Sequence, residues 1–346
     1  MKLKIRDSLE VYEDRKGDYV FFFAGSRQSK RFSVDSLVKD LISLLSKEDY
    51  ERDEIISLMS ENYNPAKINS ALNALQSQKI ITSYEENDAK RFQEKQFLFV
   101  DEFSKNYEET VKIMEDLKRK TISIFGLGGI GSWMANGMAQ IGIGKLILCD
   151  PDIVNESNLN RQLFFTPEDI GKFKAEVLTM KIKGSLCIPD KRRISSEENL
   201  DDIVSQSDFI INCADEPSVY QTSRIIDDYS KKHNVPFCIA GGYNFHNGLV
   251  GPIFVPGKTA ILNDFLDYQK RNNLFTDLTP IRMQKQSGSL GSIAGTVANI
   301  QCGEIFKHLT GIAQPNYNQF GEFNFLESRL DWFDFSKKAK QINLSN

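Results

Sequence analysis

The feature that most constrains the fold is an apolar strand pattern that runs directly into a glycine-rich turn and then a helix. Residues 121–125 read as a buried strand, and the stretch 126–131 follows with the spacing G-x-G-x-x-G. Glycine permits a tight turn and close backbone approach, while the first turn of the following helix offers N–H groups and a positive dipole end to phosphate. We therefore expect nucleotide phosphates to bind at four glycines: Gly126, Gly128, Gly129 and Gly131.

Apolar strand patterns alternate with amphipathic helix patterns beyond this turn. Such alternation is typical of βαβ units, in which successive strands lie parallel. We predict an α/β fold with a doubly wound, mostly parallel, Rossmann-like sheet. After a first helix that ends near Ile141, the strand patterns lie at 144–150, 208–215 and 235–242, and the helix patterns at 172–182 and 217–232.

The pattern changes near residue 90, so we predict a separate domain over 1–88 and the nucleotide-binding domain over 89–346. Short alternating segments at 8–14, 18–25 and 30–34 predict a small antiparallel sheet. Three helix patterns at 35–45, 53–62 and 64–80 follow, and 81–84 returns as a strand. This order predicts a compact α+β module of winged-helix type.

Composition excludes several classes of partner. A net charge of −4 and a pI near 5.6 give no overall field for nucleic acid or anionic lipid. No apolar run approaches the roughly 20 residues of a membrane span, and the first residues lack a signal-peptide pattern, so we expect a cytoplasmic protein. The five cysteines are scattered without any C-x-x-C pair. We therefore expect neither zinc nor disulfides.

Charged residues after the next strands separate nucleotidyl transfer from hydride transfer. Asp150 ends the second strand, where a carboxylate can accept hydrogen bonds from a ribose, and to this point a dehydrogenase fits equally well. Arg161 and Lys174 then supply two cations, which a nicotinamide site does not need and a departing pyrophosphate does. Asp215 follows the third strand. A carboxylate beside a triphosphate implies a cation, so we predict that Asp215 binds Mg²⁺.

Together, these motifs resemble the ThiF/MoeB superfamily of carboxyl-adenylating enzymes over about residues 90 to 325. The likeness rests on GLGGIG, the run from Asp150 to Gln162, the G-K-F-K stretch ending at Lys174, the strand ending at Asp215, and a glycine-rich stretch at 287–311. The resemblance implies a two-fold dimer that borrows a basic residue, Arg91 or Lys95, across subunits. It implies ATP ligands at Asp150, Asn158, Arg161, Gln162, Lys174 and Asp215.

Two departures narrow the expected reaction. The cysteine pairs that hold zinc in many superfamily members are missing, and the segment 264–291 has no cysteine to form a thioester. We expect the enzyme to form an acyl-adenylate or an acyl-phosphate. A nucleophile on the substrate itself would then attack the activated carboxyl group. His246 is the one histidine that merits a test as a base.

The first module resembles the PqqD-like elements that bind leader peptides by adding a strand to an exposed sheet edge. The resemblance places the peptide at Lys30, Arg31, Phe32 and Ser33 and along the helix at 66–78, which carries Lys67 and Asn73. The whole chain resembles the adenylating enzymes of ribosomal peptide maturation, the class that makes pantocin A and microcin C. That resemblance implies antibiotic biosynthesis in which glutamate side chains of a precursor peptide are activated, dehydrated and cyclised.

A cluster of basic residues indicates a binding surface for acidic groups, and two alternative functions also fit the sequence. Four basic residues before Ser287 are expected to meet an acidic core peptide: Lys270, Arg271, Arg282 and Lys285. One alternative function is a non-catalytic ThiF-like partner that only delivers a leader peptide to another enzyme. Another is adenylation of a sulfur-carrier protein or a peptide C-terminus.

Overall fold

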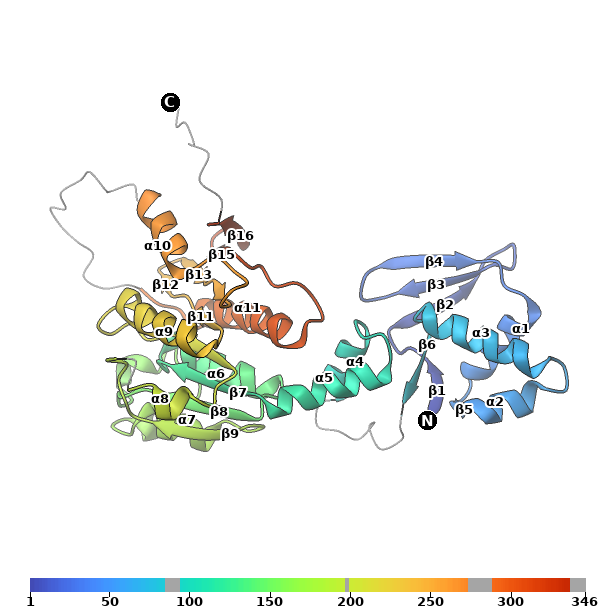
Figure 1. Cartoon of the computed structure of the whole chain (residues 1–346), viewed down its shortest axis with the longest axis horizontal. Helices are drawn as coiled ribbons and strands as arrows, with labels where there is room; N and C mark the ends of the chain where they lie inside the picture. The colour runs from blue at the N-terminus through green and yellow to red at the C-terminus, as the bar shows by residue number, and fades with distance from the viewer. Residues whose placement is uncertain (85–93, 197–198, 273–287, 337–346) are drawn as a thin grey trace, which may run out of the picture. The chain divides into compact units, whose positions relative to one another are not determined.

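The computed structural model describes residues 1–84, 94–196, 199–272 and 288–336. Contacts between Cα atoms divide the chain into two compact units, Met1–Asp116 and Leu117–Asn346, which Figure 1 shows as ribbons. Within the described residues, no helix has the length and apolar character needed to cross a membrane.

The first unit combines two small antiparallel sheets with helices. One sheet has the order β5-β1-β6 and the other β2-β3-β4. Its strands are β1 (Lys2–Ile5), β2 (Leu9–Glu13), β3 (Tyr19–Phe23), β4 (Gln28–Phe32), β5 (Tyr50–Glu51) and β6 (Ile81–Tyr84), and its helices are α1 (Ser36–Leu45), α2 (Arg52–Met59), α3 (Pro65–Ser77), α4 (Glu94–Asp101) and most of α5 (Tyr107–Arg119).

The three predicted helices of this unit form, because each has a local start signal and one apolar face. The Asp35 side chain accepts the Val38 amide at the start of α1, and Asn64 accepts the Ala66 amide at the start of α3. The predicted strand at 81–84 does not extend the sheet of the other three strands. It pairs instead with β1, a strand that the charged residues of KLKI hid from pattern reading.

Helix α4 joins the first unit, so this unit extends past residue 88. The Arg6 guanidinium, 4% exposed, donates to the Asp101 carboxylate at 3.0 Å, and Thr110 of α5 donates to the same carboxylate at 3.3 Å. Lys79 donates to the Phe103 carbonyl at 3.1 Å. Buried polar contacts of this kind hold their elements together because separating them leaves an uncompensated charge.

The second unit contains the predicted doubly wound sheet. Its order is β14-β11-β10-β7-β8-β9, and every pair is parallel except β11 with β14. A second sheet has the antiparallel order β12-β13-β15-β16. The elements are β7 (Thr121–Phe125), α6 (Gly129–Gln140), β8 (Lys145–Cys149), α7 (Lys174–Lys181), β9 (Leu186–Asp190), α8 (Asp201–Val204), β10 (Phe209–Asn212), α9 (Val219–His233), β11 (Phe237–Ile239), β12 (Tyr243–Asn244), β13 (Asn247–Val250), β14 (Ile253–Phe254), α10 (Leu262–Arg271), α11 (Gly291–Thr310), β15 (Gln319–Asn324) and β16 (Arg329–Asp334).

The direction in which strands are added reverses between β7 and β10. From β7 the chain proceeds to β8 and β9 on one side, then returns to β10 and β11 on the other. Ligands of open α/β sheets bind outside the carboxyl ends of the strands at such a reversal. The glycine turn after β7 and Asp215 after β10 both lie at that place.

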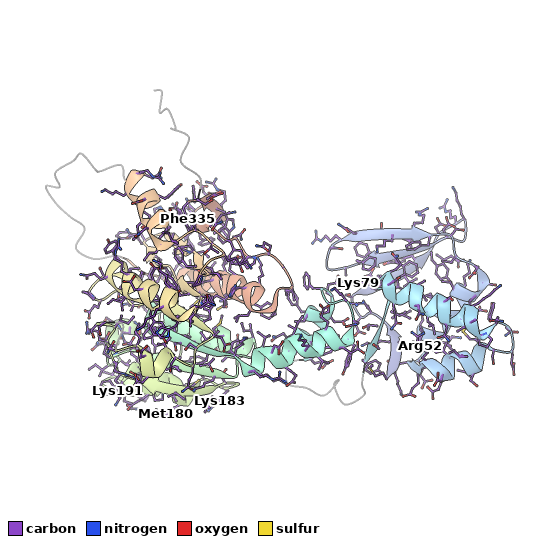
Figure 2. The ribbon with its side chains drawn as sticks, in the orientation of Figure 1. Arg52, Lys79, Met180, Lys183, Lys191 and Phe335 are labelled. Atoms are coloured by element: carbon purple, nitrogen blue, oxygen red, sulfur yellow. The ribbon has the colours of Figure 1, made fainter. Side chains whose placement is uncertain are left out.

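Aromatic packing joins the central sheet to the later elements of the unit. Phe335, 1% exposed and labelled in Figure 2, packs on Phe265 with ring centroids 5.4 Å apart. Within the glycine-rich stretch, residues 291–310 form α11, whose small residues admit close packing against α6. A Cβ atom at Gly137 would stand 2.6 Å from the Cys302 sulfur. Side-chain volume at these positions therefore sets the spacing of α6 and α11.

Candidate active site

The glycine turn is shaped by direct backbone contact with the end of β10. Gly126 has a φ of +83°, and a Cβ there would stand 2.6 Å from the Cys213 carbonyl oxygen. A Cβ at Gly131 would overlap the Gly126 carbonyl oxygen. Glycine is required at both positions because any side chain would displace main-chain atoms.

Asp150 connects the end of β8 to this turn. Its carboxylate accepts the Leu127 amide at 2.6 Å and the Asp152 amide at 2.9 Å. Asp150 is only 4% exposed. Burial raises the pKa of its carboxyl group, against the opposing effect of Lys174 and of the two amides. One carboxylate thus orders the turn and presents negative charge to the neighbouring lysine.

Lys174 begins α7 and is buried at this place. Its ammonium lies 2.9 Å from the Asp152 carboxylate and 3.9 Å from that of Asp150. A buried cation between two carboxylates is held in position before any anionic ligand arrives, which is the arrangement that favours phosphate binding.

The loop that carries Arg161 is held against α6. The Trp133 indole donates to the Arg161 carbonyl at 3.3 Å, and the Leu163 amide donates to the Ser132 hydroxyl at 3.0 Å. The Arg161 guanidinium donates to the Ser157 carbonyl and to the Asn160 side chain. Both acceptors are neutral, so an incoming anionic phosphate can compete for this cation.

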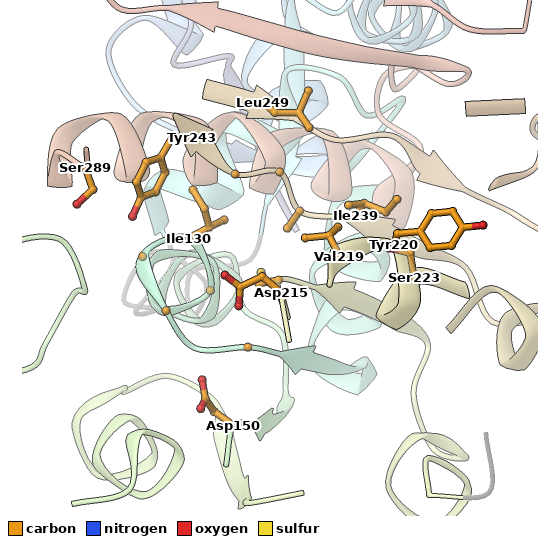
Figure 3. Close-up of a pocket in the computed structure, with 18 of the residues that line it drawn as sticks. Ile130, Asp150, Asp215, Val219, Tyr220, Ser223, Ile239, Tyr243, Leu249 and Ser289 are labelled. Atoms are coloured by element: carbon orange, nitrogen blue, oxygen red, sulfur yellow. The ribbon is translucent and has the colours of Figure 1, made fainter. Parts of the chain in front are cut away.

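These groups surround one cavity of about 870 Å³, part of which Figure 3 shows. Asp215 points into it from the loop after β10. Among the described residues, Asp215 has no hydrogen bond or ion pair to another side chain. The charged residues that line the cavity are Asp150, Asp152, Arg161, Lys174 and Asp215. The geometry therefore gathers two cations and three carboxylates around the glycine turn.

The other predicted site residues that the structure describes lie outside the lining. Asn158 accepts the Asn155 amide at 3.0 Å and caps a short turn. Gln162 is buried, and its side-chain oxygen has no partner among the residues described. Lys95 stands exposed on α4 in the first unit. Arg91 falls outside the described residues. His246 lies on the exposed tip between β12 and β13, away from the cavity lining.

The predicted peptide-binding residues lie on β4, just after it, and on α3. Lys30 and Arg31 are exposed, as are Ser33, Lys67 and Asn73, and Phe32 is half-buried. Lys30 donates to the Gln78 side chain at 3.2 Å, which brings β4 next to the end of α3. In the loop cluster, Lys270 and Arg271 end α10 and do not line the cavity, while Arg282 and Lys285 lie outside the described residues.

Pattern reading missed Tyr243, which lies on the glycine turn. Its hydroxyl occupies the space that a Cβ atom of Gly129 would fill. Burial raises the pKa of the phenol, although neighbouring Arg161 and Ser289 act in the opposite direction. The one available signal was an aromatic residue directly after Gly241 and Gly242 at the end of a strand.

Cys213 is the one cysteine that lines the described cavity. It is half-buried. Burial raises the pKa of its thiol, so the sulfur stays protonated at neutral pH and is a poor nucleophile. All five cysteines are unpaired. The described residues also hold no group of three or more histidine, cysteine or acidic side chains able to bind a metal.

Comparisons with known proteins agree with this geometry. The model of the ThiF family matches residues 70–345. The sulfur carrier protein ThiS adenylyltransferase of Escherichia coli (strain K12) is 29% identical over 201 residues, which are 56% of this chain and 74% of that protein.

Two solved proteins share the fold over both units. E. coli MccB, solved with AMPCPP and MccA, is 19% identical with a TM-score of 0.70 and 97% coverage of each chain. PaaA is 19% identical with a TM-score of 0.72, over 95% of this chain and 99% of that chain.

Proposed function

Because the chain belongs to the ThiF family, we propose that it uses ATP to activate a carboxyl group as an acyl-adenylate. The observation that carries this proposal is the convergence of the glycine turn, Asp150, Arg161, Lys174 and Asp215 on one cavity. Turn amides and the two cations suit a triphosphate, and Asp150 suits a ribose. E. coli MccB, which shares the fold, has also been solved with ATP.

In the proposed step, a carboxylate oxygen of the substrate attacks the α-phosphorus of ATP. A new P–O bond forms, the bond to the bridging oxygen breaks, and the electron pair leaves with pyrophosphate. Arg161 and Lys174 stabilise the charge that develops on the phosphates. Neither cation transfers a proton, since the attacking oxygen is already ionised at neutral pH.

Asp215 is suited to hold Mg²⁺ with the nucleotide. Mg²⁺ is usually held by one or two carboxylates together with substrate phosphates and water, so the exposed Asp215 carboxylate fits, whereas exposed Asp152 is already paired with Lys174. The bound ion would supply positive charge to the phosphates. Asp150 is already engaged by two amides and a lysine, which leaves Asp215 as the better ligand.

Replacing Asp215 with alanine should lower ATP consumption by about 100-fold, because the phosphates lose the cation that the carboxylate holds. The measurement is release of AMP and pyrophosphate in the presence of Mg²⁺ and a precursor peptide. Asp228→Ala on α9 is the matched control, since that exposed carboxylate does not line the cavity. A non-catalytic delivery protein would show the same background in wild type and Asp215→Ala, and that result would refute the proposed chemistry.

We further propose that the substrate is a ribosomally made precursor peptide whose glutamate side chains are activated for dehydration and cyclisation. The leader would bind the PqqD-like module at 1–88, and leader binding would hold a weakly bound carboxylate beside ATP. Support comes from the two-unit fold shared with PaaA and with MccB, which was solved with MccA.

The exposed strand β4 offers the place for the leader. Within the described residues it pairs with β3 alone, and four of its five residues are exposed. An added strand would pair with its free backbone groups, while side chains such as Lys30 and Lys67 would select the sequence. The nearby end of α3 supplies the adjoining surface.

Binding of a synthetic leader peptide should slow amide hydrogen exchange in β4 by about tenfold or more, because newly paired amides exchange only after local opening. Strand β2 is the internal control, since it forms the other edge of the same three-stranded sheet. Hydrogen exchange followed by mass spectrometry compares the two edges in the full-length protein. Protection of β2 with none in β4 would contradict the proposed site.

A second candidate function is adenylation of the C-terminus of a sulfur-carrier protein. The likeness to the ThiS adenylyltransferase favours it. Incubation with ATP and purified carrier distinguishes the two, because a carrier-adenylate adds the mass of AMP to the intact carrier. Its appearance without any precursor peptide would favour this second function.

We also propose that the protein acts as a two-fold dimer in which Arg91 or Lys95 completes the partner's site. Mixing a Lys95→Ala, Arg91→Ala double variant with Asp215→Ala should restore activity that each lacks alone. Failure of the mixture to recover any activity would argue against a shared site.

A further inference from the structure

The lining of the cavity divides into two chemically different parts. All five charged residues come from the loops after β8 and β10, the Arg161 loop and the start of α7. The elements opposite contribute six apolar or aromatic residues, which we name the apolar wall: Val219, Tyr220, Ile239, Leu249, Phe265 and Leu266. The remaining lining from α9, β11, β13 and α10 is neutral. Charge is therefore absent from that part of the described lining.

The apolar wall stands apart from the polar groups above the glycine turn. In Figure 3, Val219, Tyr220 and Ile239 lie on the opposite side of Asp215 from Tyr243 and Ser289. In that view, Asp215 lies between these two polar side chains and the three wall residues. A carboxyl group that attacks phosphorus near Asp215 would have the wall beside it.

The wall includes both buried residues of the hydrophobic core and exposed residues. Ile239 and Phe265 belong to the hydrophobic core of the unit, with 4% and 3% exposure, and Leu249 and Leu266 pack against that core. Val219 and Tyr220 are 44% and 48% exposed. Open apolar surface inside a cavity is stabilised when a ligand covers it with apolar groups.

The nucleotide has another place for its base. A smaller hollow shares Gly126, Asp150, Asp152 and Asp215 with the main cavity. Its other lining residues are Phe125, Cys149, Pro151, Arg192, Arg193, Ile194, Ala214 and Glu216. With the ribose at Asp150 and the phosphates toward Lys174, the base would face this open hollow of about 60 Å³. The apolar wall then remains for the acid.

Building on the proposed adenylation, we propose that the apolar wall binds an apolar or aromatic group of the substrate that lies next to the activated carboxyl group. The enzyme would therefore prefer substrates with an apolar group at that position. The Arg224 guanidinium lies 4.7 Å from the centroid of the Tyr220 ring. Among the described residues, the rest of the wall would leave the charge of an acidic neighbour unpaired, which is unfavourable. The predicted contact between the basic loop cluster and an acidic core peptide therefore does not apply to the part of the substrate that lies inside the cavity. The described pair of that cluster, Lys270 and Arg271, lies outside the lining.

Two stable mimics of an acyl-adenylate test the proposal without a precursor peptide. Phenylpropanoyl sulfamoyl adenosine and succinyl sulfamoyl adenosine share the nucleoside and the linker and differ only in a terminal phenyl or carboxylate. Calorimetric titration of the full-length protein should show that the phenyl compound binds about tenfold more tightly or better. Equal affinities, or tighter binding of the succinyl compound, would overturn the proposal.

Two double variants test whether the apolar wall causes the preference for the phenyl compound. The double variant Val219→Ser, Tyr220→Ser should reduce the preference for the phenyl compound by about fivefold and leave ATP affinity within about twofold. The matched control is Leu186→Ser, Ile188→Ser on β9, whose side chains are exposed but outside the cavity. An unchanged preference in the first variant would remove the wall from the explanation. If wild type binds neither mimic nor ATP, the proposed adenylation itself fails.

Discussion

Lys174→Met is expected to lower the rate of ATP–pyrophosphate exchange by about 100- to 1000-fold, the usual effect of removing one preorganised charge at a reacting phosphate. Methionine keeps most of the buried stem and removes the ammonium that now lies 2.9 Å from Asp152. Exchange is measured with radioactive pyrophosphate, saturating Mg²⁺ and the precursor peptide. If Lys174 bound ATP equally well in the ground state and the transition state, its loss would raise the KM for ATP and leave kcat unchanged.

The control for this change is Lys183→Met, two residues after the end of α7 and labelled in Figure 2. Lys183 is exposed, and its ammonium donates to the Met180 carbonyl. Its loss should leave exchange within about twofold, as for most surface changes. Equal losses in both variants would mean that a general electrostatic effect, and not the cavity, explains the result.

Gly131→Ala should cost about 3 kcal/mol or more of stability, because the added methyl group overlaps the Gly126 carbonyl oxygen and the backbone must move. The same movement widens the turn and displaces the amides that face phosphate. Affinity for ATP should fall by about 100-fold even in protein that remains folded. Thermal unfolding and calorimetric titration with ATP measure the two effects separately.

Gly303→Ala provides the matched control. This glycine lies inside α11, and a Cβ there would meet nothing within 4 Å. Alanine should stabilise the helix by about 0.5 to 1 kcal/mol and leave ATP affinity unchanged. Normal ATP binding by Gly131→Ala would show that the turn does not carry the nucleotide.

Local sequence signals predicted the parallel sheet and its helices because each βαβ unit contains its own evidence. The glycine turn, Asp150 and Lys174 lie within about one such unit, so their chemistry can be read from order along the chain. The strand β1 and the pairing of β6 with it were missed, since strand partners about 80 residues apart leave no local trace in the sequence.

Order along the chain thus determined the α/β architecture, the nucleotide turn and the charged residues near it. Only tertiary structure decided that Tyr243 covers the turn, that Asn158 caps its own loop, and that one wall of the cavity is apolar. The physical reason is that hydrogen-bonded turns and strand patterns are local, whereas a cavity is formed by side chains from α9, β11, β13 and α10 that meet only after the sheet has folded.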